Sequence, residues 1–173
     1  LTDEGKLYVW GNSSLADVKI KEEFQGDIAK FAMCDYAYVC LMRDGSVQYT
    51  GYKTSTVYAN IPEELSSGVV DITATANTFA AVKNDGSVYV WGNTANGEGQ
   101  IPAYEGKVME LHGGRNHYLA LLDTGELIAW GNDHFGQADV PSSLTSGKET
   151  ASQIYTGYFQ NYVVTDTGDI ITW

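Results

Sequence analysis

One pattern of apolar and polar positions recurs along the chain. A short apolar run is followed by an acidic or polar pair and a glycine, and then by a second run that usually ends in Trp-Gly. The turn glycines are residues 5, 45, 86, 125 and 168, so successive spacings are 40, 41, 39 and 43 residues. Pro62, Pro102 and Pro141 follow the same period, 40 and 39 residues apart. This period predicts a repeat protein in which each unit is one supersecondary structure.

Each turn glycine is predicted to close a β-hairpin. Asp-Gly between two apolar runs is a strong hairpin signal, because glycine accepts the positive φ that a tight turn requires. The run before the turn, as at 118–121, is apolar on both faces, which is typical of a strand covered on both sides. The run after the turn, as at 87–91, alternates more. Earlier strands are expected to begin near these residues: Ile28, Val69, Val108 and Gln153.

Three strands, with a fourth expected, recurring about every 40 residues describe the blades of an all-β propeller. The repeats are predicted at 12–51, 52–92, 93–131 and 132–173, with 1–11 forming the end of a preceding blade. The pattern has the same phase at both ends of the sequence. The favoured fold is therefore about four blades, an arc or fragment of a larger propeller of about seven blades. A ring of several chains and a closed four-bladed monomer are the alternatives.

The charge narrows the classes of partner. The net charge is −12, from 10 Lys+Arg and 22 Asp+Glu residues. Nucleic-acid binding needs clustered cations, so no nucleic-acid partner is expected, whereas a basic protein surface is compatible. No apolar run approaches the roughly 18 residues that span a bilayer, so no membrane insertion is expected. Cys34 and Cys40 are poorly spaced to bond with each other and are expected as buried thiols.

A search for catalytic and metal-binding patterns yields no candidate. Asp133, His134 and Asp139 form a mixed cluster, but a polar loop between blades explains them without a metal. Gly147-Lys148 fails as a phosphate loop, because residue 142 is Ser and residue 149 is Glu. No Gly-x-Ser-x-Gly motif is present. The sequence therefore predicts no enzyme, no catalytic residue, no metal site and no cofactor.

A family resemblance is carried by residues 114–137. They contain Gly-x-x-His, an Ala-Leu strand, Asp-x-Gly, and then Trp-Gly-x-x-x-x-Gly-Gln, and so resemble the regulator-of-chromosome-condensation repeat. Residues 84–100 match nearly as well, with an ending that is stretched to Gly99-Gln100. The first repeat departs most, with Thr50 in the Trp position and no Gly-Gln after Gly11 or Gly51. The short period is similar to that of bacterial and phage members, including the second type of β-lactamase inhibitory protein.

The resemblance implies a non-catalytic module for binding proteins or other subunits of an assembly, such as a phage virion or tail. A secreted inhibitor of an enzyme such as a β-lactamase, and a guanine-nucleotide exchange factor, are the alternatives. Localisation stays open among virion, extracellular and cytoplasmic settings. Propellers present loops of successive blades on a common face. The predicted partner-binding residues are Asp35, Tyr36, Asn77, Arg115, Asn116, Tyr158 and Phe159, with a second surface at His134 and Phe135. At the repeat start, His117 is expected to make a structural hydrogen bond inside its blade.

Overall fold

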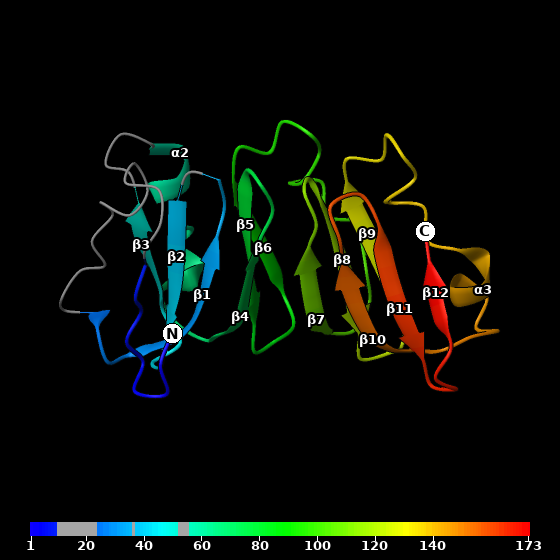
Figure 1. Ribbon diagram of the computed structural model, residues 1–173, viewed down its shortest axis with the longest axis horizontal. Helices are drawn as coiled ribbons and strands as arrows, with labels where there is room; N and C mark the ends of the chain where they lie inside the picture. The colour runs from blue at the N-terminus through cyan, green and yellow to red at the C-terminus, as the bar shows by residue number, and fades with distance from the viewer. Residues whose placement is uncertain (10–23, 36, 52–55) are drawn as a thin grey trace.

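The computed structural model describes residues 1–9, 24–35, 37–51 and 56–173 (Figure 1). Within these ranges the chain forms four antiparallel sheets of three strands each, and each sheet takes three consecutive strands in sequence order. The first two sheets comprise β1 (Ile28–Met33), β2 (Ala37–Met42), β3 (Val47–Gly51), β4 (Val69–Ala74), β5 (Thr78–Lys83) and β6 (Val88–Gly92). The other two comprise β7 (Val108–Gly113), β8 (His117–Leu122), β9 (Leu127–Gly131), β10 (Ala151–Thr156), β11 (Asn161–Thr165) and β12 (Ile170–Thr172). The fold is all-β, as predicted.

The predicted hairpins are formed at the repeated glycines. Gly45, Gly86, Gly125 and Gly168 join the second and third strands with φ between +83° and +88°. Residues other than glycine rarely adopt such values. Each first strand also carries a register shift at its start, for example between Val69 and Asp71. The four sheets are thus copies of one unit, and we call them blades 1 to 4 in chain order.

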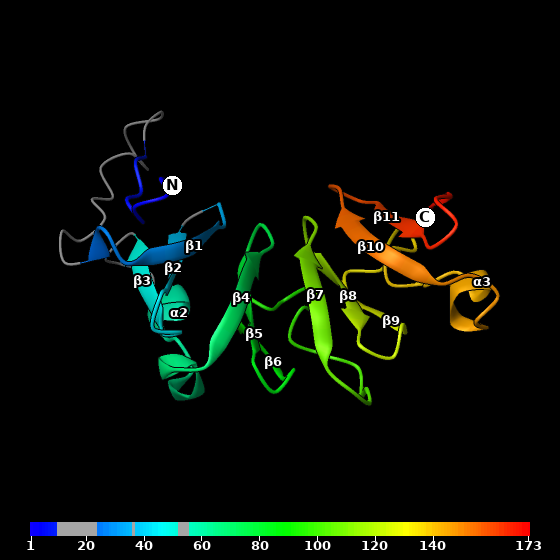
Figure 2. The same cartoon turned by 90° about the horizontal axis from the view of Figure 1, so that it is seen from below.

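The blades stand side by side in an arc, with their first strands β1, β4, β7 and β10 as neighbours (Figure 2). The hydrophobic core is divided among the contacts between blades. Val39 and Leu41 of blade 1 pack with Ile72 and Phe79 of blade 2. The same arrangement joins blade 2 to blade 3 and blade 3 to blade 4. Since no blade covers both of its own faces, stability comes from nearest neighbours.

Short helical turns occupy part of the connections between blades. They are α2 (Thr56–Ala59), η2 (Glu63–Ser66) and α3 (Ser142–Thr145). The expected fourth strand is not formed in the described residues, where 93–107 runs as turns and irregular chain. The strand expected near Gln153 begins two residues earlier, at Ala151. The predicted repeat boundaries near residues 12 and 52 lie outside the described residues and stay predictions.

Residues 1–9 lie against the free side of blade 1. Leu7 and Val9 pack with Ile28, Cys40 and Met42. The carbonyl of Gly5 accepts a hydrogen bond from the Ile28 amide at 3.3 Å, as the carbonyls of Gly45 and Gly86 accept from the first strands of blades 2 and 3. Residues 1–9 therefore make the contact that a hairpin turn of one blade makes with the blade that follows it.

The described residues hold no helix long and apolar enough to cross a membrane. Cys34 and Cys40 are buried and form no disulfide, in agreement with the prediction. Burial raises the pKa of the Cys40 thiol to about 11, so this thiol is protonated and unreactive at neutral pH. In the part of the chain that the structure describes, His, Cys, Asp and Glu side chains form no group of three or more that could hold a metal ion.

Candidate interaction surface

The loops that join the first and second strands of the blades lie on one face of the arc, along the top of Figure 1. A ladder of backbone hydrogen bonds connects them. The amide of Asp35 donates to the carbonyl of Ala76 at 3.0 Å, Ala76 donates to Arg115 at 2.7 Å, and Arg115 donates to Tyr158 at 3.2 Å. These loops, which the repeat alignment selected as equivalent, are therefore held at fixed spacing on one face.

The floor of this face is shallow and made of small residues. Thr75, Ala76, Gly113 and Gly114 line a hollow of about 350 Å³, with Asp35 and Tyr158 among the residues around it. Gly113 is required by the close approach of blade 2, because a Cβ there would lie 2.2 Å from the carbonyl oxygen of Ala74. The small residues thus let successive blades approach closely and leave the face open in its centre.

A cluster of exposed aromatic rings borders the hollow at blades 3 and 4. Tyr158 and Phe159 meet edge to face with 4.5 Å between ring centroids, and Phe135 lies 5.1 Å from Phe159. The ring centroids of His134 and Phe135 are 5.2 Å apart, and the Arg115 guanidinium lies 4.4 Å from the Tyr158 ring centroid. Exposed fractions are 66% for Phe135, 56% for Tyr158 and 43% for Phe159. We call these five residues the aromatic cluster.

The loop that carries Phe135 is fixed by its own hydrogen bonds. The buried side chain of Gln137 accepts a hydrogen bond from the Phe135 amide at 2.8 Å. Asp133 accepts from the amide of Ala138 at 2.8 Å, and Asn132 accepts from the amide of His134 at 3.0 Å. The His134 and Phe135 rings are therefore presented by a structured loop, so the loss of backbone conformational entropy on binding a partner is small.

Of the nine predicted binding residues, the structure brings five together, leaves Asn77, Asn116 and Asp35 apart from them, and does not describe Tyr36. Arg115, His134, Phe135, Tyr158 and Phe159 form the aromatic cluster. The side chains of Asn77 and Asn116 hydrogen-bond to each other at 3.2 Å and tie two loops together. Asp35 is exposed at the other end of the ladder, and Tyr36 lies outside the described residues. The two surfaces that the sequence treated separately are one, because Phe135 and Phe159 touch.

His117 has a structural role, but its hydrogen bond leaves the blade. Its Nε2 lies 3.0 Å from Oδ1 of Asn161 in blade 4, and both residues are fully buried. Thr78 makes the equivalent contact with the hydroxyl of Tyr118 at 2.7 Å. The expected bond inside the blade is therefore wrong. The bond between blades could have been predicted from the sequence, because His117 and Asn161 are polar residues at adjacent positions of successive repeats.

Burial lowers the pKa of His117, and the hydrogen bond to Asn161 only partly opposes this. The imidazole is thus neutral at physiological pH. Asn161 in turn donates from Nδ2 to the carbonyl of Gln137 at 2.8 Å, which links this buried pair to the loop of Phe135. His117 supports the surface from below and does not reach it.

The buried residue equivalent to Gln137 in the preceding repeat is Glu98, and this corrects the sequence alignment. Glu98 accepts hydrogen bonds from the amide and side chain of Asn96, both at 3.0 Å. Gly97 and Gly136 both have positive φ, +91° and +82°. The repeat ending is therefore Gly97-Glu98, at the usual spacing, and is not stretched to Gly99-Gln100.

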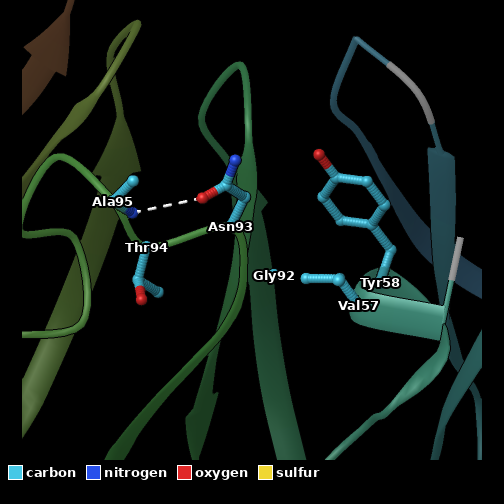
Figure 3. Close-up of a pocket in the computed structure, with 6 residues that line it drawn as sticks. All are labelled: Val57, Tyr58, Gly92, Asn93, Thr94 and Ala95. Atoms are coloured by element: carbon cyan, nitrogen blue, oxygen red, sulfur yellow. Dashed lines mark hydrogen bonds between the residues drawn. The ribbon is translucent and has the colours of Figure 1, made fainter.

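An open hollow of about 610 Å³ lies between blades 1 and 2 (Figure 3). Val57 and Tyr58 of α2 face Asn93, Thr94 and Ala95 across it, and the side chain of Asn93 accepts a hydrogen bond from the Ala95 amide at 3.3 Å. The only titratable group among its described lining residues is the Tyr58 hydroxyl. This hollow offers less chemistry for recognition than the aromatic cluster.

Comparison with known proteins supports the repeat type. Residues 69–100 and 113–137 match the family model of the regulator of chromosome condensation (RCC1) repeat. No curated protein sequence matches the chain. The matched segments contain β4 to β6 and the hairpin of β8 and β9. These are the segments in which the motif is most complete.

Three solved structures illustrate the fold. The CRINKLY WD40 ectodomain of the Arabidopsis thaliana receptor kinase ACR4 has a TM-score of 0.68 and 19% identity, covering 98% of this chain and 59% of that chain. Prp20p from Saccharomyces cerevisiae has a TM-score of 0.67 and 19% identity, covering 89% of this chain and 45% of that chain. The C-terminal domain of gp131 from bacteriophage phiKZ has a TM-score of 0.54 and 12% identity, covering 87% of this chain and 53% of that chain.

The chain spans between 40% and 59% of the length of these and related structures. At such low identity the likeness concerns the fold alone. The predicted fold class, about four blades of a larger propeller, fits both the four sheets and these neighbours. Residues 69–100 and 113–137 therefore resemble the regulator-of-chromosome-condensation repeat, as the motif at residues 114–137 predicted, and the chain has the fold of these β-propellers.

Proposed function

We propose that this chain is a non-catalytic protein-interaction module whose partner binds at the aromatic cluster. The observation that carries the proposal is the contact of three exposed rings, Phe135, Tyr158 and Phe159, drawn from two loops of adjacent blades. Aromatic and arginine side chains dominate binding energy at protein interfaces. Exposed apolar groups that gather in one place indicate a site of association.

The charge around the cluster favours a basic partner. Asp133 and Asp139 are exposed on the same loop as Phe135, and Asp35 is exposed at the far end of the ladder. Arg115 is the cation of the cluster, and its guanidinium already lies over Tyr158. With a net charge of −12, a partner surface rich in Lys or Arg gains from long-range attraction and from cation–π contacts with the rings.

The relatives support a role in association. One solved structure is of Kap60 bound to yeast RCC1 (Prp20), and another reports binding of Prp20p to Gsp1p and histones. The phage neighbour gp131 supports the finer hypothesis that the module belongs to a virion or tail assembly. The hypotheses of a β-lactamase inhibitor and of an exchange factor predict tight inhibition of a β-lactamase and faster nucleotide release from a small GTPase. Either result would replace the proposal.

The test compares Phe135→Ala with the unchanged chain in quantitative affinity capture from its native source, followed by titration of the captured partner. The expected result is a loss of affinity of roughly 30-fold, the effect of removing a hot-spot side chain of about 2 kcal/mol. Tyr8→Ala is the matched control, because Tyr8 is an equally exposed aromatic residue outside the cluster. Equal losses in both variants, or none in Phe135→Ala, would contradict the proposal.

Salt tests the charge of the partner separately. Binding to a basic partner should weaken as salt rises from about 50 mM to 500 mM, because the Debye length shortens over that range. Asp133→Asn should reduce the salt dependence of the association rate more than it changes the dissociation rate. Binding that is insensitive to salt would retain the aromatic site and exclude the basic partner.

A further inference from the structure

The shallow hollow between the blade loops has an acidic group and a basic group on its rim. Asp35 of blade 1 and Arg115 of blade 3 both line it. Asp35 is exposed, and Arg115 is half-buried. Among the residues that the structure describes, neither side chain forms an ion pair. Each charge therefore stands without an opposite charge in this part of the chain, and the Arg115 guanidinium lies over the Tyr158 ring instead.

The backbone ladder sets the distance between the two charges. The Asp35 amide donates to the carbonyl of Ala76 at 3.0 Å, and the Ala76 amide donates to the carbonyl of Arg115 at 2.7 Å. Segments joined side by side by backbone hydrogen bonds lie about 5 Å apart, so two such steps separate Asp35 from Arg115 by about 10 Å. The Arg115 side chain reaches across the next step, because its guanidinium lies 4.4 Å from the Tyr158 ring centroid. The carboxylate and the guanidinium are therefore roughly 10 to 15 Å apart.

Further hydrogen bonds hold this spacing. The side chains of Asn77 and Asn116, each next to a ladder position, bond to each other at 3.2 Å. The carbonyl of Asn77 accepts from the Asn93 amide at 2.9 Å. The carbonyl of Asn116 accepts from the Asn132 amide at 2.8 Å. The loops of blades 2 and 3 are thus anchored to their own blades as well as to each other, so the separation of the charges is preorganised.

The floor between the two charges consists of small residues. In blades 2 and 3 these are Thr75, Ala76, Gly113 and Gly114. A Cβ at Gly114 would lie 2.1 Å from the His117 ring, so the close packing at this point requires glycine. An occupant can therefore lie across the floor with its backbone close to both loops.

We propose that the hollow binds an extended segment of the partner with a Lys or Arg side chain at position i for Asp35 and an Asp or Glu side chain at position i+4 for Arg115. Alternate side chains of an extended chain point to the same side, and the rise is about 3.3 Å per residue, so these two positions lie about 13 Å apart. This separation matches that of the two charges. The residue at i+2 lies over the floor and is small. The carboxylate at i+4 can meet the Arg115 guanidinium with two parallel hydrogen bonds.

The order of the charges makes the site selective. A segment with the two charges exchanged would bring like charges together at both Asp35 and Arg115, which is a common way of rejecting a wrong partner. The rings of Phe135 and Phe159 lie beyond Arg115 along the ladder, so an aromatic residue at i+6 reaches the aromatic cluster. The inference rests on the proposed function and adds to it the order basic, acidic and aromatic along the partner segment. The rest of the partner surface can be basic, since the site requires a single carboxylate.

The probes are synthetic heptapeptides that are acetylated and amidated at their ends. One is Lys-Thr-Ala-Thr-Glu-Thr-Phe, and its control, Glu-Thr-Ala-Thr-Lys-Thr-Phe, has the same composition and net charge. Both are also made in the reverse order, so that either chain direction is tested. Titration into the isotope-labelled 173-residue chain is followed by NMR of the ladder amides. In the direction that binds more tightly, we expect the first form to bind about tenfold more tightly than its control.

Exchange of the two charges of the protein gives the matched variant. The double variant Asp35→Lys with Arg115→Glu should reverse the preference and favour the control peptide. Its melting temperature should stay close to that of the unchanged chain, because neither side chain forms an ion pair within the described residues. Equal binding of the two peptides, no binding at millimolar peptide, or an unchanged preference in the double variant would each overturn the proposal.

Phe135→Ala separates this proposal from the proposed function. The variant should weaken binding of the first peptide and keep its advantage over the control. Loss of partner capture in Phe135→Ala together with equal binding of the two peptides would overturn the charge order and leave the aromatic site. A retained charge preference, with partner capture unaffected by Phe135→Ala, would instead overturn the aromatic site and support the charge order.

Discussion

The strands β8 and β11 come from equivalent positions of successive repeats, yet only one is buried throughout. Every residue of β8 is buried, whereas β11 alternates between buried and exposed or half-buried positions. The three central positions are apolar in both strands, with Leu119 and Tyr162 as counterparts. The difference lies in the neighbours, since β8 has a blade on each side and β11 has a described blade on one. Burial in this fold is therefore a property of blade pairs, as expected for repeat proteins.

The largest expected effect comes from the counterparts Leu119 and Tyr162. Leu119→Ala removes a fully buried side chain between blades 3 and 4 and should lower the free energy of unfolding by about 2–5 kcal/mol. Tyr162→Ala should cost about 1 kcal/mol or less, because the residue is partly exposed. Urea denaturation followed by tryptophan fluorescence measures both. Equal losses would show that the neighbouring blade is not what distinguishes the two strands.

The glycines before these strands give the next largest difference. A Cβ at Gly114 would lie 2.1 Å from the ring of His117, whereas at Gly157 the nearest atom is 3.4 Å away, in the ring of Tyr162. Gly114→Ala should therefore destabilise by about 1–3 kcal/mol through overpacking. Gly157→Ala is expected within about 0.5 kcal/mol of the unchanged chain. Equal losses of stability in the two variants, measured by thermal denaturation, would contradict this expectation.

His117 and Gln160 occupy the same position in blades 3 and 4. The variant His117→Gln therefore tests how protonation of His117 affects the stability of the folded chain. Because burial lowers the pKa of His117 in the folded chain, the unfolded chain binds a proton more readily. Stability from the neutral imidazole is present above about pH 6.5 and is lost as the pH falls below it. His117→Gln should weaken this loss, at a cost of about 1.5 kcal/mol or less at pH 8.

Urea midpoints between pH 5 and pH 8 give the measurement. His112→Gln is the companion variant, because burial also lowers the pKa of His112. We expect each variant to remove part of the acid sensitivity and the double variant to remove most of it. A double variant with the pH dependence of the unchanged chain would exclude the histidines as its cause.

The smallest expected effect on stability is that of Phe135→Ala. The side chain is 66% exposed, and the backbone of its loop is held through Gln137. The free energy of unfolding should change by no more than about 0.5 kcal/mol, so that a loss of partner binding can be attributed to the surface. A marked fall in melting temperature would instead make Phe135 part of the folded framework.

Much of the fold could be predicted from spacing alone. Asp-Gly at 44–45 and 85–86 specifies hairpins because the chemistry of a tight turn is local. The buried strands follow from their apolar runs. The aromatic cluster was predicted only as two groups, since contact between Phe135 and Phe159 depends on how two blades are placed. The bond from His117 to Asn161 was missed for the same reason, because 44 residues separate the partners.

The sequence by itself determined the repeat unit, the hairpin turns and the residues that face a neighbour. These depend on backbone preferences and on alternation along single strands, which are written in contiguous residues. Only the tertiary structure decided which blades contact each other and that the loops form a hydrogen-bonded ladder. These are contacts between units about 40 residues apart, and a sequence pattern shows that a residue can pair without showing what meets it.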